Sequence, residues 1–307
     1  MILRQPQQLE VAPVDLAEPG DCDVVVDIEW SGISTGTEKL LWSGRMPPFP
    51  GLGYPLVPGY ESVGRISAAG ERSGRRIGER VFVPGARCFK SIRGLFGGAA
   101  SRLVVPGARA VPIDVELGER AVLLALAATA HHCLSAEGAR PPDLIVGHGV
   151  LGRLLARLAV RAGAAPVVWE RDPQRAAGAD GYDVVDPESD ARHDYRAIYD
   201  VSGDSNILDR LIARQAAGGE IVLAGFYSEP LNFSFAPAFV RETRLRVAAE
   251  WREADLLAVR DLAARGELSL DGLITHRLPA ASADVAYRTA FDDRSCLKMI
   301  LDWRATA

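Results

Sequence analysis

The sequence predicts an α/β protein in which a mostly β domain precedes a doubly wound domain with a parallel sheet. The first third of the chain carries short runs of Val, Ile, Gly and Pro, and residues 24–30 alternate apolar and polar side chains as a half-buried strand does. From about residue 143 onward, strand-like and helix-like segments alternate, which is typical of parallel strands joined by right-handed crossovers. A glycine-rich turn follows the first strand of this second region.

Length, composition and charge limit the classes of function. The 307 residues suffice for two domains, and a hydrophobic fraction of 48% can fill their cores. The formal net charge of −5 argues against nucleic acid as a partner, because nucleic-acid-binding proteins usually carry a basic face. No apolar run reaches the length of a membrane span, and the N-terminus does not resemble a signal peptide. We therefore expect no integral membrane segment and a cytoplasmic location.

The first domain is expected to be built from short strands and a proline-rich loop. Strands are predicted at residues 24–30, 62–68 and 80–83. The loop is marked by Pro47, Pro48, Pro50, Pro55 and Pro58, which cannot occupy central strands. The four cysteines form no Cys-x-x-Cys pair, so we expect scattered thiols: Cys22, Cys88, Cys133 and Cys296.

The second domain is expected to alternate strands and helices. Its strands are predicted at residues 143–146, 166–170, 197–201 and 220–224. Its helices are predicted at residues 119–136, 151–162 and 207–216. From about residue 273 the pattern becomes irregular, and it ends in a helix at 283–292 and a strand at 297–301.

The glycine-rich turn carries the signature of a dinucleotide-binding Rossmann domain. Gly147-His148-Gly149-Val150-Leu151-Gly152 fits G-x-G-x-x-G, and it stands between a predicted strand and a predicted helix, as that signature requires. The first glycine permits the turn, the second lets the backbone approach a pyrophosphate, and the third lets helix and strand pack closely. The helix N-terminus offers free N–H groups to the phosphates, and His148 would be their neighbour.

The end of the next strand favours NAD over NADP. Glu170 follows the strand about 20 residues after the glycines, where a carboxylate accepts hydrogen bonds from the adenosine ribose and repels a 2′-phosphate. Arg171 follows directly and would tolerate NADP, so the use of NADP stays open. We count Arg171 and Arg175 among the cofactor-binding residues.

Two segments that precede the glycine-rich turn in the chain also resemble a known family. Gly32-Ile33-Ser34 and Gly59-Tyr60-Glu61-Ser62-Val63-Gly64, together with the glycine-rich turn, resemble the medium-chain dehydrogenase/reductase family over nearly the whole chain. The resemblance implies a GroES-like β catalytic domain over residues 1–117, a Rossmann domain over 118–273, and a C-terminal return to the catalytic domain over 274–307.

The zinc ligands of many members of that family are replaced here. Zinc alcohol dehydrogenases carry Gly-Ile-Cys and Gly-His-Glu at these places, and the Cys and the His bind the catalytic zinc. In this chain the Cys position is Ser34 or Thr35, and the His position is Tyr60, none of which is a usual zinc ligand. Between residues 83 and 99 Cys88 stands alone, so the family's four-cysteine structural zinc lobe is missing as well. We expect no metal and zinc-independent chemistry.

A narrower resemblance concerns the substrate. Residues 33–38, 45–55, 58–61, 130–134 and 292–299 resemble a member of the family that oxidises a hydroxyethyl group on a tetrapyrrole pigment. That resemblance implies a tetrapyrrole alcohol as substrate and NAD as hydride acceptor. The loop over residues 46–54 would then supply apolar surface to the pigment. Four basic residues would meet a propionate or would simply be solvated: Arg45, Arg87, Lys90 and Arg93.

Four side chains are candidates for the proton chemistry that zinc would otherwise support. By resemblance, Thr37 occupies the family's hydroxyl relay position, although it also suits a helix N-cap. Tyr60 would orient the substrate oxygen or only fill the vacated volume. Glu61 is either a buried base with a raised pKa or a partner in a structural ion pair. His132, like its neighbour His131, is a general base or a packed histidine.

Further cofactor contacts are expected at strand ends and at two positions implied by the resemblance. Ligands bind outside the carboxyl ends of parallel strands, and two strands end here in short turns that comprise Ser202, Gly203, Ala224, Gly225 and Phe226. By resemblance, Thr129 touches the nicotinamide and Lys298 lies near the pyrophosphate, unless Lys298 is a solvated strand residue.

Two other functions remain open at the level of sequence. One is a zinc-free reductase of quinones or enoyl compounds in the same family, and such enzymes prefer NADPH. The other is a non-catalytic dinucleotide-binding protein, which would bind NADH without hydride transfer to a pigment. The catalytic base, the ring oxidation state of the pigment and the oligomeric state are also left open, with a homodimer among the options.

Overall fold

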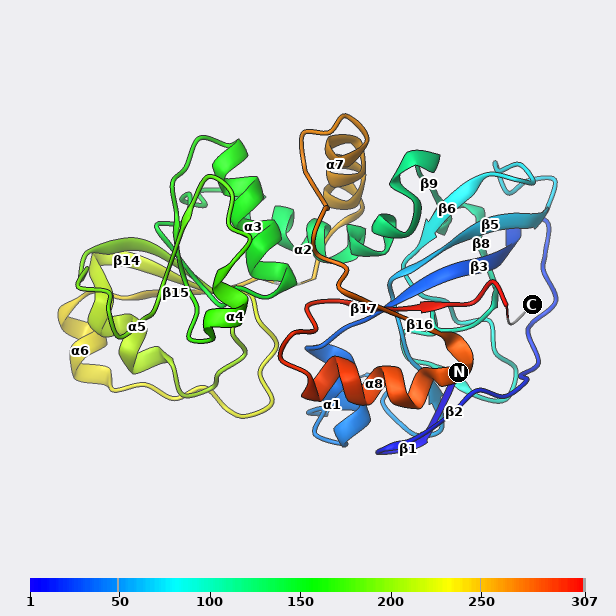
Figure 1. Cartoon of the computed structure of the whole chain (residues 1–307), viewed down its shortest axis with the longest axis horizontal. Helices are drawn as coiled ribbons and strands as arrows, with labels where there is room; N and C mark the ends of the chain where they lie inside the picture. Colours follow the sequence, from blue (N-terminus) through cyan, green and yellow to red (C-terminus); the bar gives the residue numbers. More distant parts are fainter. Residues whose placement is uncertain (49, 249, 306–307) are drawn as a thin grey trace. The chain divides into compact units, whose positions relative to one another are not determined.

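The computed structural model describes residues 1–48, 50–248 and 250–305, and it divides the chain into two units (Figure 1). Unit 1 consists of Met1–Ala125 and Asp271–Ala307, and unit 2 consists of Leu126–Leu270. The C-terminal segment therefore belongs to the same unit as the N-terminal strands.

Unit 1 is built on a seven-stranded sheet with the order β16-β17-β3-β5-β6-β9, in which β8 also pairs with β3. Its strands are β3 (Asp23–Ile33), β5 (Ser62–Ala69), β6 (Arg80–Val83), β8 (Arg102–Pro106), β9 (Val111–Pro112), β16 (His276–Pro279) and β17 (Met299–Asp302). The predicted strands at 24–30, 62–68 and 80–83 are confirmed. In β3 the alternation buries Val24, Val26 and Ile28 in the core.

The remaining elements of unit 1 are a small sheet and short helices. The small sheet has the order β2-β1-β4-β7, with β1 (Ile2–Gln5), β2 (Gln8–Glu10), β4 (Leu56–Val57) and β7 (Arg93–Gly94). The helices are α1 (Thr37–Ser43), α8 (Ala283–Asp292) and the 3₁₀ helices η1 (Gly107–Arg109), η2 (Val115–Leu123) and η3 (Ala280–Ser282). The helix predicted at 283–292 is confirmed with the same bounds.

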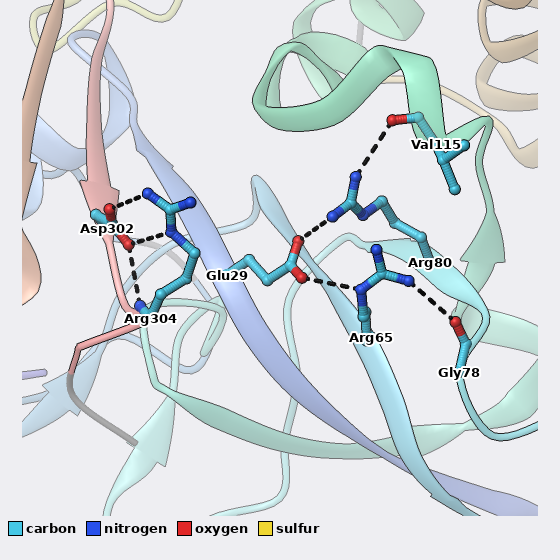
Figure 2. Close-up of polar contacts among 7 residues, drawn as sticks. All are labelled: Glu29, Arg65, Gly78, Arg80, Val115, Asp302 and Arg304. Carbon is cyan, nitrogen blue, oxygen red and sulfur yellow. Dashed lines mark hydrogen bonds and ion pairs between the residues drawn. The ribbon is translucent and has the colours of Figure 1, made fainter.

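Charged side chains form pairs on β3 and its neighbouring strands and at the end of β17, where Arg304 pairs with Asp302 (Figure 2). The guanidinium groups of Arg80 and Arg304 lie over the ring of Trp30, 5.4 and 5.1 Å from its centroid. Arg80 and Arg65 both bind the Glu29 carboxylate, at 2.7 and 3.1 Å. Each cation–π contact at such a site contributes about 0.5–1 kcal/mol. The Arg304 contact helps to hold the C-terminal segment on β3, and the Arg80 contact joins β6 to β3.

Unit 2 is a six-stranded parallel sheet with the order β12-β11-β10-β13-β14-β15. Its strands are β10 (Leu144–Val146), β11 (Val167–Trp169), β12 (Asp183–Val185), β13 (Tyr195–Asp200), β14 (Gln215–Leu223) and β15 (Arg244–Val247). Numbered along the chain, the order reverses at β10, as in doubly wound sheets that bind dinucleotides. The predicted Rossmann architecture is confirmed.

The helices of unit 2 differ in part from the prediction. They are α2 (Leu124–Ser135), α3 (Val150–Arg161), α4 (Pro173–Ala176), α5 (Leu208–Arg214), α6 (Phe235–Val240) and α7 (Glu253–Ala264). The helix predicted at 119–136 is wrong in its first turn, because η2 covers residues up to Leu123 and Gly118 is not helical. The helix predicted at 207–216 ends at Arg214, because β14 already begins at Gln215.

A buried ion pair ties three segments of unit 1 together. The Lys298 Nζ atom lies 2.6 and 2.9 Å from the two carboxylate oxygens of Glu61, and it donates to the Ile33 carbonyl oxygen at 3.2 Å. The two side chains are 2% and 0% exposed. Gly32 makes room for the carboxylate, because a Cβ atom at that position would lie 2.0 Å from Glu61 Oε2. The Glu61–Lys298 pair therefore joins three segments: the one before β17, the end of β3 and the one before β5.

We expect the Lys298→Met variant to lower the free energy of unfolding by about 3–5 kcal/mol, because it leaves a buried carboxylate without its cation. Burial raises the pKa of Glu61 and the Lys298 ammonium opposes that shift, so the variant must take up a proton at this site to fold. Denaturant unfolding measures the loss.

The double variant Glu61→Gln/Lys298→Met should regain most of that stability, since no charge remains buried. Lys39→Met is the matched control, because Lys39 Nζ donates only to the Phe291 carbonyl oxygen in a half-buried contact. A Lys298→Met protein as stable as the control would show that the pair contributes no such constraint.

Candidate active site

The glycine-rich turn of unit 2 has the shape that a dinucleotide requires. Gly147 has φ of +104°, and a Cβ atom at Gly152 would lie 1.9 Å from the Gly147 carbonyl oxygen, so both positions need glycine. A Cβ atom at Gly149 would meet nothing within 4 Å. Gly149 is the N-cap of α3 and makes no side-chain cap. The N-terminus of α3 therefore has open space at Gly149 and no side-chain cap, which fits a pyrophosphate bound by backbone N–H groups.

Glu170 lies where β11 ends, beside this turn. Its carboxylate accepts hydrogen bonds from the Asp172 N–H at 2.9 Å and from the His148 N–H at 3.3 Å. A pocket within unit 2 is lined by four predicted residues, Gly147, Glu170, Arg171 and Ser202, together with Asp204 and Arg210, which the sequence did not indicate. Arg171 and Arg210 put positive charge beside the Glu170 carboxylate, which affects the choice between NAD and NADP.

The side chain of His148 is engaged within unit 2, and its place beside the phosphates stays a prediction. Its imidazole is fully buried, with Nδ1 2.6 Å from the Arg175 carbonyl oxygen and Nε2 2.8 Å from the Tyr182 hydroxyl. Burial lowers the pKa of His148 to about 4, so the ring is neutral and both nitrogens are in use. His148 holds the turn against residues 175–182. Arg175 contributes its carbonyl oxygen to this contact, and a role for its side chain at the cofactor stays a prediction.

The two predicted turns at the ends of β13 and β14 are anchored by Asp200. Its carboxylate accepts hydrogen bonds from the Ser202 N–H at 2.9 Å and from the Tyr227 hydroxyl at 2.8 Å, and its carbonyl oxygen accepts from the Gly225 N–H at 3.0 Å. Asp200 is fully buried, which raises its pKa although these hydrogen bonds oppose the shift. The sequence offered a signal for this role of Asp200. It ends a buried strand, and a carboxylate in a protein core rarely lacks a hydrogen-bond partner.

In unit 1, three hydroxyl groups meet where the first domain was expected to hold its chemistry. The Tyr60 hydroxyl donates to Ser34 Oγ at 2.7 Å, and the Thr37 side chain is a second hydrogen-bond partner of the phenol. Phe96 packs edge-on against the Tyr60 ring, with 5.2 Å between centroids. Ser34, Thr37 and Tyr60 are called the hydroxyl cluster below.

The structure decides between the alternatives for Thr37 and limits the role of Tyr60. Gly36 is the N-cap of α1 and Thr37 is the first helical residue, so the N-cap alternative for Thr37 is wrong. Burial raises the pKa of Tyr60, the charges of Glu61 and Glu38 raise it further, and the bonds to Ser34 and Thr37 oppose the shift. Tyr60 is therefore a protonated phenol that donates and accepts hydrogen bonds, and it is unsuited to act as a free base.

Glu61 was a candidate base and Lys298 a candidate phosphate-binding cation, but the structure pairs the two side chains with each other. Glu61 is held in the buried pair with Lys298, which favours the ion-pair alternative. The prediction that Lys298 binds the pyrophosphate is wrong, and so is the alternative that it is solvated. Its three N–H groups are directed to Glu61 and to the Ile33 carbonyl oxygen, which leaves none for a phosphate.

His132 is engaged in structure rather than poised as a base. The Nδ1 atoms of His131 and His132, both on α2, lie 2.7 and 2.9 Å from the two carboxylate oxygens of Asp255 on α7. Burial raises the pKa of Asp255, but hydrogen bonds from the Arg252 N–H and from both histidines lower it more, so it stays ionised. These contacts join α2 to α7 and favour the packed alternative for both histidines. Thr129 lies on the same helix, and its contact with the nicotinamide stays a prediction.

Glu38 and Tyr287 are buried polar residues that the sequence did not single out. Glu38 is 1% exposed, its Oε1 accepts the Ser34 N–H at 3.0 Å, and the Tyr287 hydroxyl donates to its Oε2. Burial raises the pKa of Glu38 to about 7. An acidic residue in the first turn of a helix usually interacts with the helix N-terminus on the surface, so its burial could not be read from the pattern.

The loop that was expected to offer apolar surface to a pigment is turned inward. Met46, Leu52 and Tyr54 pack into a core cluster of unit 1, and the Tyr54 hydroxyl donates to the Leu41 carbonyl oxygen at 2.6 Å. Of the basic residues beside it, Lys90 pairs with Glu18, and Arg93 lies against Gly53. Met46, Leu52 and Tyr54 are thus engaged within unit 1, Phe49 of the same loop lies outside the described residues, and a contact of the loop with a pigment stays a prediction.

The described residues, 1–48, 50–248 and 250–305, contain no cluster of three or more His, Cys, Asp or Glu side chains that could hold a metal ion. Among the same residues, no helix combines the length and the apolar character that crossing a membrane requires.

Known proteins share the sequence and the fold of this chain. Residues 20–115 match the alcohol dehydrogenase GroES-like domain. The 2-desacetyl-2-hydroxyethyl bacteriochlorophyllide A dehydrogenase of Rhodobacter capsulatus is 57% identical over 306 residues, which are 99% of this chain and 98% of the relative. The protein of the same name from Cereibacter sphaeroides is 58% identical, over 100% of this chain and 98% of the relative.

Solved structures agree with the predicted fold class, a GroES-like β domain joined to a Rossmann domain. An alcohol dehydrogenase from Escherichia coli CFT073, complexed with NADH, has a TM-score of 0.81 at 22% identity, over 98% of each chain. A zinc-binding dehydrogenase from Sinorhizobium meliloti 1021, bound to NADP, has a TM-score of 0.82 at 22% identity, again over 98% of each chain. The chain belongs to the medium-chain dehydrogenase family, as do these two bacteriochlorophyllide A dehydrogenases, and is an oxidoreductase of the alcohol dehydrogenase type.

Proposed function

We propose that this protein oxidises the 3-(1-hydroxyethyl) group of a bacteriochlorophyllide to a 3-acetyl group, with NAD as cofactor and without zinc. The names and the identity of the two bacteriochlorophyllide dehydrogenases support the substrate. The observation that carries the chemistry is the hydroxyl cluster, because Ser34 and Tyr60 stand where zinc enzymes of the family carry ligands and are hydrogen-bonded to each other.

The reaction removes a hydride from the carbinol carbon and a proton from its hydroxyl group. When bound, the nicotinamide supplies the hydride acceptor. Gly149, Val150 and Leu151 would hold its pyrophosphate, and Glu170 its adenosine ribose. The Tyr60 hydroxyl donates to Ser34, so its oxygen lone pairs are available to the Thr37 hydroxyl, and the Thr37 oxygen in turn can accept the hydrogen of the alcohol. Thr37 is the first acceptor in this proposal, Tyr60 and Ser34 orient it, and the proton is finally released to solvent water.

Cellular location and assembly are part of the proposal. The four cysteines carry thiols rather than disulfides, which suits a reducing compartment and supports a cytoplasmic enzyme. β15 is an edge strand, and four exposed apolar side chains lie on it and on α6: Phe235, Phe239, Val240 and Val247. A second copy that pairs its own β15 here would cover them, so we infer a homodimer. A measured solution mass of 33.0 kDa would contradict it.

The assay of the proposed reaction follows the absorbance of the purified protein with NAD and a 3-(1-hydroxyethyl) bacteriochlorophyllide. An acetyl group conjugated with the ring shifts the long-wavelength band, and chelators should leave the rate unchanged because hydroxyl groups replace the zinc ligands. Stoichiometric zinc with chelator-sensitive turnover would contradict the zinc-free mechanism. NADH binding without pigment turnover would favour the non-catalytic alternative, and NADPH-driven reduction of a quinone would favour the reductase.

Glu170→Ser should lower the NAD-to-NADP ratio of kcat/KM by roughly 10-fold to 100-fold, since a hydrogen bond to a charged group contributes about 1.5–3 kcal/mol. Arg171 and Arg210 line the same pocket and would be left to attract a 2′-phosphate. Asp172→Ser is the matched control, because Asp172 caps α4 and serine can keep that cap. An unchanged ratio in Glu170→Ser would show that the carboxylate does not select the cofactor.

Thr37→Val should lower turnover by about 100-fold to 10,000-fold with little loss of NAD affinity, because it deletes the first proton acceptor. Stability should change little, since Thr37 is not the N-cap of α1. Thr35→Val, at an exposed position two residues away, is the matched control and should keep near-normal turnover. Near-normal single-turnover hydride transfer in a stable Thr37→Val protein would refute the relay.

A further inference from the structure

We propose that Glu38 and Tyr287 form a buried positioning pair beneath the hydroxyl cluster, and that the ionisation of Glu38 sets the direction in which the hydroxyl groups of Ser34, Thr37 and Tyr60 point. The inference rests on the proposed function, because it concerns how the same cluster accepts the proton of an alcohol. Glu38 acts through the cluster and does not itself receive that proton.

The contacts form one connected chain within unit 1. Tyr287, on α8, donates its hydroxyl to Glu38 Oε2, and Glu38 Oε1 accepts the N–H of Ser34 at 3.0 Å. Ser34 Oγ then accepts the Tyr60 hydroxyl at 2.7 Å. A residue of the C-terminal segment is thereby joined to the cluster through a single carboxyl group.

The charges around Glu38 make its protonation state adjustable. Among the described residues, the titratable groups that face it are Tyr287 from α8, Tyr60 and Glu61 from the segment before β5, and Lys298 from the segment before β17. The Lys298 ammonium is bound to Glu61, so the hydrogen-bond partners of Glu38 are the Tyr287 phenol and the Ser34 N–H rather than a cation. A buried carboxyl group without its own cation readily holds a proton.

The balance of these interactions places the change of charge near neutral pH. Burial raises the pKa of Glu38 to about 7, the Tyr287 hydroxyl and the Ser34 N–H lower it, the Glu61 charge raises it, and Lys298 lowers it. Glu38 is therefore neutral below about pH 7 and anionic above it.

The charge on Glu38 biases the cluster electrostatically. An anion at the inner end attracts the hydroxyl hydrogens of Tyr60 and Thr37 inward, which turns oxygen lone pairs outward toward the alcohol. A neutral Glu38 removes that bias. Oxidation should accelerate as pH rises through the pKa of Glu38, and the reverse reduction, which needs outward donors, should slow.

The test compares pH profiles of kcat/KM for pigment oxidation on both sides of pH 7. Wild type should show a rising limb near pH 7. Glu38→Gln keeps an acceptor for the Ser34 N–H and a partner for Tyr287, so it should fold, lose the limb, and lower kcat roughly tenfold with little change in KM. Tyr287→Phe removes a hydrogen bond that lowers the pKa of Glu38, so its limb should move to higher pH.

Tyr54→Phe is the matched control. Tyr54 also binds α1, through the Leu41 carbonyl oxygen, but it does not touch Glu38. The rising limb of the pH profile of Tyr54→Phe should therefore coincide with that of wild type. A limb that persists unchanged in Glu38→Gln would overturn the proposal, and so would a Tyr287→Phe profile identical to the control.

A second measurement separates this inference from the proposed function, because it needs no substrate. Infrared titration of the protein alone should show a protonated carboxyl band in wild type that disappears as pH rises through about 7, is missing in Glu38→Gln and persists to higher pH in Tyr287→Phe. If wild type fails to oxidise the pigment but the carboxyl band behaves as described, the proposed substrate is wrong and the Glu38–Tyr287 pair is supported. If the band is missing from wild type, the pair is refuted.

Discussion

The buried Glu61–Lys298 ion pair is the constraint on which unit 1 depends. Glu61 directly follows Tyr60, and Gly32 and Ile33, which touch the pair, directly precede Ser34. Two charges removed from water are stable only when each satisfies the other, so the pair fixes both segments that carry the hydroxyl cluster. Since Lys298 lies just before β17, the cluster can be complete only when the C-terminal strand has joined β3.

Buried polar side chains play the same part in unit 2. His148 holds the glycine-rich turn, Asp200 holds the turns after β13 and β14, and Asp255 joins α7 to the histidines of α2. Each of these groups is bound by two or more partners, which is what burial of a polar group demands. These side chains fix the loops, so the proposed cofactor contacts of the glycine-rich turn need not hold the loops in place.

Hydroxyl groups impose a different chemistry from zinc. A metal ion stabilises an alkoxide by its own charge, whereas hydroxyl groups stabilise it only if their hydrogen bonds are oriented beforehand. The raised pKa of Tyr60 excludes a ready phenolate, so orientation within the cluster matters more than basicity. A conjugated pigment suits such a site, because charge that develops next to the ring can delocalise into it.

The sequence by itself determined the fold class, the strands of both sheets that carry clear apolar patterns, the glycine-rich turn and the position of Glu170. These follow from local periodicity and from glycines that no other residue can replace. It also identified Ser34 and Tyr60 as replacements for zinc ligands. The partners of His148, Lys298, His132 and Glu38 were decided by tertiary structure alone. Each has a partner that lies 27 to 265 residues away in the chain, and a polar residue has the same local pattern whether it binds a ligand or a buried neighbour. Only packing, which sets how much water each group loses and which opposite charge it meets, distinguishes the two.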